Sequence, residues 1–173
     1  DTQTDSHYGL PIIEHDRARL DSIELYPFRK LIQEDVAGIM MAHINVPALD
    51  ATPKQAATLS KKIVTELLKT EMGFKGLVFT DAMNMKGVTS GHDLGEPELM
   101  AYLAGNDIIE FSLNISASIA KIEEALKTES LTTDQVKLKC RRILHQKYKL
   151  ELHKKPFQKS ENLILDINNQ TAR

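Results

Sequence analysis

Three short apolar runs along the chain have the composition of buried β-strands. They read VAGIMMAHINV at residues 36–46, GLVFT at 76–80 and DIIEF at 107–111. A breaker or a polar residue bounds each run, such as Pro47 after the first and Asp81 after the second. Strands that are covered on both faces show such nearly continuous apolar stretches. The pattern therefore predicts three buried strands.

The segments between and after these runs show the 3.6-residue apolar period of amphipathic helices. This period predicts helices over residues 23–32, 59–72, 96–104 and 115–126, and a fifth helix that begins near Thr132. Ser60 suits the N-cap of the second helix, and Pro97 suits the first turn of the third. Parallel strands need a crossover, which an intervening helix supplies, so the alternation predicts βαβ units in a parallel α/β sheet. Three strands are too few for a closed or doubly wound sheet, which favours the C-terminal part of a larger fold.

Composition narrows the class of protein. The 173 residues are 42% hydrophobic and 27% charged, which is typical of one globular domain. No apolar run approaches the roughly 20 residues of a membrane helix, and the first residues lack the regions of a signal peptide. The single cysteine, Cys140, excludes an internal disulfide and a multi-thiolate zinc site. A net charge of -2 indicates no overall attraction to nucleic acid or to a membrane, and it favours a small neutral partner.

Basic residues concentrate near the C-terminus. Residues 137–159 contain nine Lys or Arg and one acidic residue. Apolar residues occur there at helical spacing, namely Val136, Cys140, Ile143, Leu144 and Tyr148. This spacing favours a docked helix with a basic outer face over a nucleic-acid-binding helix, because aromatic residues are sparse. Residues 151–173 lose this periodicity and are interpreted as a linker or the start of a following element.

Asp81 is the first candidate for chemistry. It ends the run GLVFT and is followed by the small residue Ala82. Loops at the C-terminal ends of parallel strands form the sites of α/β folds, so a carboxylate at this position is a catalytic candidate. The alternative is that Asp81 caps the following helix.

Asp5 and His7 form a second candidate. In an extended loop, side chains two residues apart point the same way, so the carboxylate could orient the imidazole and favour its protonated form. Such an imidazole could donate and recover a proton. The alternative is an Asx turn beside an incidental surface histidine.

His43, near the end of the first apolar run, is the third candidate site. A buried histidine that supports its neighbours is the favoured interpretation, and a substrate-binding side chain is the alternative. Acidic and histidine residues near the N-terminus match no established coordination loop, so no metal is predicted. These residues are Asp1, Asp5, His7, His15 and Asp16.

Four blocks of the sequence resemble glycoside hydrolase family 3, and within it the bacterial β-N-acetylglucosaminidase branch. They read DTQTDSHYGLP, GIMMAHINVPALD, LSKKIVTELLKTEMGFKGLVFTDAMNMKGV and AGNDIIEF, and they occur in the family's order. The resemblance covers about residues 1–150 and implies the C-terminal part of a (β/α)8 TIM-type barrel, with the three runs as strands six, seven and eight. The N-terminal half of that barrel, with the family's lysine–histidine recognition motif, would be required in cis.

The resemblance also implies roles. Asp81 falls on the family's nucleophile, and His7 with Asp5 falls on its general acid/base dyad. The implied activity is retaining hydrolysis of terminal β-linked N-acetylglucosamine from peptidoglycan fragments or chitooligosaccharides, without a metal or organic cofactor. Two alternatives stay open: transfer to phosphate instead of water, and a truncated, non-catalytic fragment or carbohydrate-binding module. The compartment, either the cell envelope or the cytoplasm of a bacterium, is left undetermined.

Overall fold

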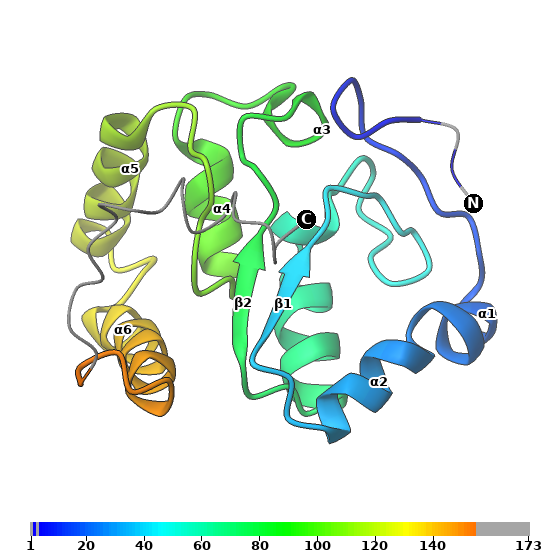
Figure 1. Cartoon of the computed structure of the whole chain (residues 1–173). Coiled ribbons are helices and arrows are strands. Elements are labelled where there is room, and N and C mark those ends of the chain that lie inside the picture. Colours follow the sequence, from blue (N-terminus) through cyan, green and yellow to red (C-terminus); the bar gives the residue numbers. More distant parts are fainter. Residues whose placement is uncertain (1, 3, 155–173) are drawn as a thin grey trace, which may run out of the picture.

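The computed structural model describes residues 2 and 4–154, in which two parallel strands are flanked by helices (Figure 1). The strands are β1 (Gly38–Met41) and β2 (Leu77–Thr80). The helical segments before β2 are α1 (Arg17–Arg19), η1 (Leu20–Glu24), α2 (Tyr26–Gln33), η2 (Ala57–Leu59) and η3 (Lys62–Glu71). Those after β2 are α3 (Lys86–Thr89), α4 (Glu96–Ala104), α5 (Ile115–Lys127) and α6 (Thr133–Lys149).

The predicted parallel βαβ unit is confirmed. β1 and β2 pair in parallel from Gly38 opposite Leu77 to Met41 opposite Thr80, and η3 makes the crossover between them. The main core lies between these strands and η3. Its buried members are Ile39, Met41, Ala57, Ile63, Val64, Leu68, Phe74, Val78 and Ala104. The first two apolar runs therefore contain core strands, as their composition indicated.

The first two predicted strands are shorter than expected, and the third forms only a single bridge. The first run pairs as a strand only at Gly38–Met41, and an isolated parallel bridge joins Asn45 to Ile12. In the run at 107–111, only Ile108 forms a bridge, to Phe79 of β2. This run leaves the extended conformation at Phe111, whose φ is 49°. The Glu110 N–H donates to the Thr80 hydroxyl at 2.9 Å and not to a backbone carbonyl of β2, so the backbone ladder does not extend.

The predicted helices are largely confirmed. α4 has the predicted bounds, with Pro97 in its first turn, and Gly105 at a φ of 123° ends it. Thr132 and Gln135 form a reciprocal capping box at the start of α6. The helix expected over 59–72 is a π-helical segment, η3, and the Ser60 hydroxyl accepts the Ile63 N–H at 3.2 Å near its start. The helix expected over 23–32 is divided between η1 and α2.

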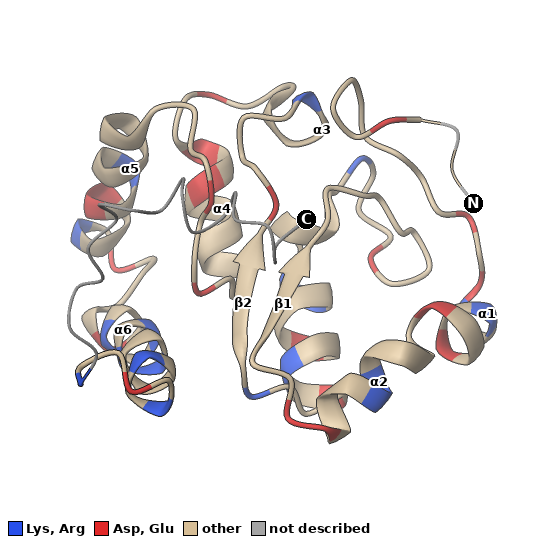
Figure 2. Ribbon diagram, viewed as in Figure 1, with Lys and Arg blue, Asp and Glu red and all other residues tan. Residues whose placement is uncertain are grey.

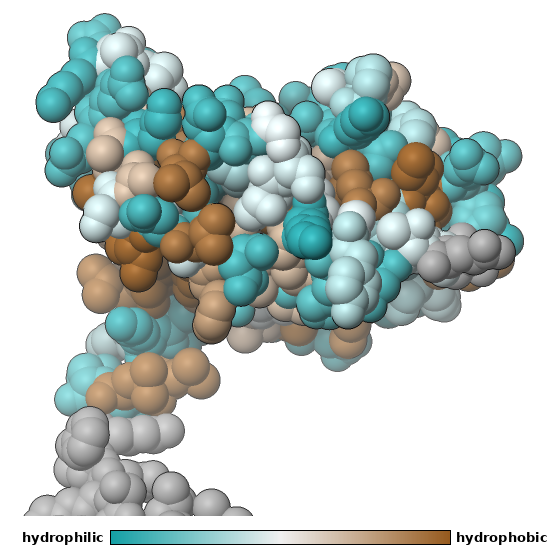
Figure 3. Space-filling view, turned by 90° about the horizontal axis from the view of Figure 1, so that it is seen from above, coloured by the Kyte–Doolittle hydropathy of each residue, from teal (hydrophilic) through white to brown (hydrophobic). Residues whose placement is uncertain are grey.

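Several apolar side chains face outward. Met40 of β1 is 58% exposed, although its neighbours Ile39 and Met41 are buried. An apolar cavity of about 310 Å³ is lined by side chains of η1, α2, β1 and η3, among them Phe28 and Leu67. Figure 3 shows further hydrophobic side chains gathered over α5 and the loop before it. The exposed side chains there are Phe111, Leu113, Ile115 and Ile119.

Helix α6 docks through charged side chains and not through its apolar stripe. Basic residues concentrate on it (Figure 2), but none of its residues is fully buried, and Leu144 and Tyr148 are exposed. Lys139 instead donates to the carbonyl oxygens of Tyr102 and Asn106. The predicted basic outer face is correct for Lys137, Arg141, Lys147 and Lys149, which are exposed. It is wrong for Lys139 and Arg142, which turn inward. The predicted linker at 151–173 lies mostly outside the described residues.

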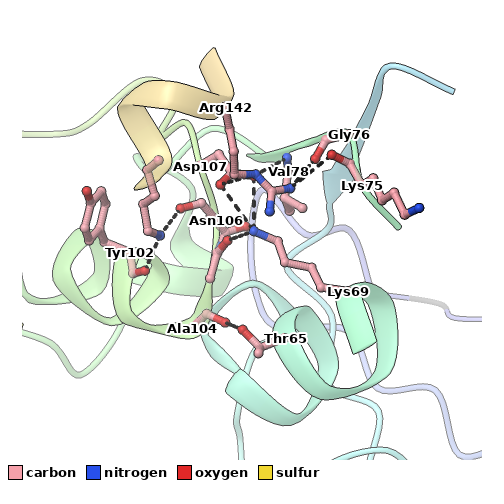
Figure 4. A network of polar contacts seen from close by, with 12 residues as sticks. Thr65, Lys69, Lys75, Gly76, Val78, Tyr102, Ala104, Asn106, Asp107 and Arg142 are labelled. Atoms are coloured by element: carbon pink, nitrogen blue, oxygen red, sulfur yellow. Dashed lines mark hydrogen bonds and ion pairs between the residues drawn. The ribbon is translucent and has the colours of Figure 1, made fainter. Parts of the chain in front are cut away.

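A buried carboxylate, Asp107, lies between the side chains of Lys69 and Arg142 (Figure 4). The Asp107 side chain is fully buried and accepts the Val78 N–H at 2.9 Å. Its oxygens lie 3.1 Å from Lys69 Nζ and 3.3 Å from Arg142 Nε. Burial, with the neighbouring charge of Lys69, lowers the pKa of Lys139 to about 7. The Asp107 side chain therefore links Lys69 of η3, Val78 of β2 and Arg142 of α6.

Asp107→Asn is expected to lower the free energy of unfolding by about 3 kcal/mol, because Lys69 and Arg142 lose their buried counter-charge. Urea unfolding followed by circular dichroism measures the change. Asp134→Asn is the control, since Asp134 is 93% exposed and pairs with Lys137 across one turn of α6. Its expected effect is below about 0.5 kcal/mol. Equal losses in the two variants would contradict the role of Asp107.

Within the part of the chain that the structure describes, no helix combines the length and the apolar character needed to cross a membrane.

Candidate active site

Asp81 lies directly after β2, at the C-terminal end of the two-stranded sheet. Its N–H donates to the Met41 carbonyl at 3.1 Å, which continues the β1–β2 pairing by one residue. Its Oδ1 accepts the N–H of Ala82 at 2.7 Å. The residue at the N-cap of α3 is Met85, so Asp81 does not cap that helix. Backbone contacts thus hold the half-buried Asp81 at the C-terminal end of the strands.

Asp5 and His7 contact each other as the spacing predicted. Asp5 Oδ1 accepts the His7 backbone N–H at 2.9 Å and lies 2.7 Å from His7 Nδ1. The Asx turn of the alternative interpretation is present, and the same carboxylate also contacts the imidazole, so the geometry fits both interpretations and the catalytic role stays a prediction. The backbone N–H and then the imidazole of His7 hold the pKa of Asp5 below its usual range. Both side chains are exposed, and Nδ1 is engaged, so Nε2 is the nitrogen left to face a ligand.

The loop that carries Asp5 and His7 lies against α3. A Cβ atom added to Gly87 would be 2.8 Å from the Gly9 carbonyl oxygen and 3.0 Å from that of Ser6. Figure 1 shows this loop beside α3, at the end of the molecule toward which both strands point. The segment after Asp81 and the loop around His7 are therefore in direct contact. Sequence reasoning missed this role of Gly87, because a glycine in a loop is equally typical of a mobile turn.

His43 is completely buried, and protein atoms engage both of its ring nitrogens. Nδ1 lies 2.9 Å from the Thr58 hydroxyl, and Nε2 lies 3.1 Å from the Ala82 carbonyl oxygen. Burial lowers the pKa of His43. This geometry favours the supporting role over the substrate-binding alternative. Thr58 was not identified from the sequence, since a threonine in a short apolar segment carries no distinctive pattern.

Among residues 2 and 4–154, no three His, Cys, Asp or Glu side chains are grouped in a way that could hold a metal ion.

Comparisons with known proteins agree on one family. A family model described as "Glycosyl hydrolase family 3 N terminal domain" matches residues 1–146. "Beta-hexosaminidase A" from Pseudoalteromonas piscicida is 33% identical over 169 residues, covering 87% of this chain and 28% of that protein. "Beta-hexosaminidase" from Nitrosospira multiformis is 34% identical over 116 residues, covering 67% of this chain and 32% of that protein.

A solved structure shares the fold. The glycoside hydrolase family 3 β-N-acetylglucosaminidase from Paenibacillus sp. str. FPU-7 superposes with a TM-score of 0.83 at 31% identity, covering 92% of this chain and 31% of that one. The chain thus spans less than a third of the length of each of these relatives. Because the family model matches most of the sequence and the relatives exceed 30% identity, this chain belongs to glycosyl hydrolase family 3.

Proposed function

We propose that this chain carries the reacting groups of a retaining β-N-acetylglucosaminidase. The observation that carries the proposal is the contact between two loops: the loop of Asp5 and His7 lies against Gly87, a few residues after Asp81. A carboxylate and a carboxylate-oriented imidazole on adjoining loops match the needs of glycoside hydrolysis. The names of the relatives, β-hexosaminidase and β-N-acetylglucosaminidase, indicate the bond that is cleaved.

In the proposed mechanism, Asp81 attacks the anomeric carbon and forms a covalent glycosyl-enzyme. His7 gives its proton to the departing glycosidic oxygen as that bond breaks. In the second step His7 takes a proton from water, and the resulting hydroxide oxygen displaces Asp81 from the sugar. Asp5 stabilises the imidazolium form of His7 through the 2.7 Å contact at Nδ1. No metal or organic cofactor takes part in either step.

The proposed fold is the C-terminal part of a (β/α)8 barrel whose N-terminal half acts in cis. Three features support it: the parallel bridges on either side of the two strands, the outward-facing Met40 and the apolar cavity beside it. A further strand and helix layer would cover these surfaces. The proposed substrates are terminal β-linked N-acetylglucosamine residues of peptidoglycan fragments or chitooligosaccharides.

The test is hydrolysis of a nitrophenyl N-acetyl-β-glucosaminide, with this chain alone and with a polypeptide that also carries the preceding half of the barrel. We expect turnover from the longer polypeptide. Folded protein without turnover in either form would overturn the proposal and favour the non-catalytic alternative. In phosphate buffer the product identifies the acceptor: free N-acetylglucosamine indicates water, and a glycosyl phosphate indicates phosphorolysis.

Gly87→Ala is expected to lower kcat by about 10-fold or more, because a new Cβ would push the His7 loop away from α3. Its φ is outside the left-handed region, so the substitution itself adds little backbone strain. Gly9→Ala is the matched control in the same loop, since its Cβ would meet only Thr4 at 3.4 Å, an ordinary contact. Steady-state kinetics of the longer polypeptide measure both. If the two variants retain equal activity, the contact at Gly87 does not position His7.

A further inference from the structure

We propose that His43 is a positioning residue for Asp81: as a neutral imidazole it donates to the Ala82 carbonyl and so fixes the turn that presents the Asp81 carboxylate. This inference rests on the proposed nucleophilic role of Asp81. It assigns to His43 a function that requires no contact with the sugar. His43 can donate to the Ala82 carbonyl only if Nε2 carries the hydrogen.

The partners of the ring decide the tautomer. The Ala82 carbonyl oxygen can only accept, so Nε2 at 3.1 Å must carry a hydrogen and donate it. Burial lowers the pKa of His43, which keeps the ring neutral near pH 7. A neutral ring with a hydrogen on Nε2 has a lone pair on Nδ1. The Thr58 hydroxyl, 2.9 Å away, therefore donates to Nδ1.

The Thr58 hydroxyl is available for this bond although two carbonyl oxygens lie near it. It is 3.1 Å from the Met41 oxygen and 2.9 Å from the Ala42 oxygen. Each of these oxygens already accepts a backbone hydrogen bond, the Met41 oxygen from the Asp81 N–H and the Ala42 oxygen from the Ile44 N–H, both at 3.1 Å. The single hydrogen of Thr58 can therefore serve His43 without leaving a buried carbonyl unpaired.

His43 thereby completes a clamp around Ala82. The Ala82 N–H donates to Asp81 Oδ1 at 2.7 Å. The Ala82 carbonyl accepts from His43 at 3.1 Å and from the Met85 N–H of its own turn at 3.2 Å. The next residue, Met83, is buried and donates its N–H to the Glu110 carbonyl at 3.0 Å. Asp81 is fixed on its other side by the bond to Met41. Of these contacts, only the one from His43 comes from a side chain on a different element, which makes it the contact that substitution can remove.

Kinetics of the longer polypeptide, which also carries the preceding half of the barrel, test the consequence. His43→Leu leaves the Ala82 carbonyl with the Met85 N–H of its own turn and removes its bond to a distant element. It is expected to lower kcat by about 100-fold, while KM changes by less than about 3-fold. His43→Gln keeps an amide donor at similar reach and is expected to recover at least about 10-fold of that loss. A merely structural histidine would make the two variants equally impaired, and that result would overturn the proposal. A loss confined to KM would also overturn it, because it would indicate substrate binding.

Nitrogen NMR of the histidine rings provides a readout that is independent of activity. In protein labelled with ¹⁵N-histidine, the signals absent from His43→Gln identify the His43 ring. We expect the Nε2–H tautomer at pH 7, and Thr58→Val is expected to shift the Nδ1 signal by removing its donor. An Nδ1–H tautomer or a doubly protonated ring would overturn the inference. If the expected tautomer is present but the wild-type protein has no glycosidase activity, the proposed function fails and the positioning role fails with it, whereas the hydrogen bond to Ala82 stands.

Discussion

Asp81→Ala is expected to lower the kcat of the longer polypeptide by about 10⁴-fold or more, since the proposed glycosyl-enzyme cannot form without the carboxylate. KM and the thermal unfolding temperature should change little, because the half-buried side chain makes its hydrogen bond to the N–H of its own neighbour, Ala82. Hydrolysis of a nitrophenyl N-acetyl-β-glucosaminide measures the loss. Asp93→Ala is the control, because Asp93 is exposed on a nearby loop and has no proposed role.

Azide distinguishes a nucleophile from a residue that only supports the site. In Asp81→Ala, azide can occupy the vacated space and displace an activated aryl leaving group directly. A single displacement inverts the anomeric centre, so the expected product is an α-glycosyl azide. A β-glycosyl azide, or wild-type activity in the variant, would contradict the assignment of Asp81.

His7→Ala is expected to lower kcat/KM by about 10³-fold on a natural disaccharide but by only about 10-fold on an activated aryl glycoside. The difference arises because a good leaving group departs with little need for protonation. The ratio of the two losses is the measurement. His145→Ala, which removes an exposed histidine of α6, is the control and should leave both rates unchanged.

The outcome that contradicts this role is an equal loss on both substrates. Azide again adds a second measurement. In His7→Ala, Asp81 still forms the glycosyl-enzyme, and azide releases it by a second displacement. The expected product is therefore a β-glycosyl azide, of the opposite configuration to that from Asp81→Ala.

The local elements were largely predictable, because local chemistry determines them. Helix α4 has the predicted bounds, since Pro97 favours its first turn and Gly105 ends it. The cores of β1 and β2 followed from apolar runs that η3 buries. The position of Asp81 after β2 and the contact between Asp5 and His7 could be predicted for the same reason, whereas their catalytic roles stay predictions.

The predictions that were wrong concern segments whose contacts are with residues distant in the sequence. The run at 107–111 has strand composition, but only Ile108 finds a partner in β2. The docking of α6 was mispredicted because hydrophobic periodicity does not register a buried carboxylate such as Asp107, which attracts basic side chains across the fold. Thr58 and Gly87 were missed because their contacts, to His43 and to the loop at Ser6 and Gly9, join segments that are distant in the sequence.

The contact between Asp5 and His7 is confined to a turn of a few residues. The two bonds from Asp5 Oδ1 to His7 involve no other element, and further backbone bonds from Tyr8 and Gly9 to the Asp5 carbonyl close the same turn. In the proposed mechanism, the proton donor and its orienting carboxylate are therefore parts of one local turn, and a displacement of this loop as a whole would leave their contact intact. An imidazole whose Nδ1 is already engaged presents the same nitrogen, Nε2, to each successive glycosidic bond.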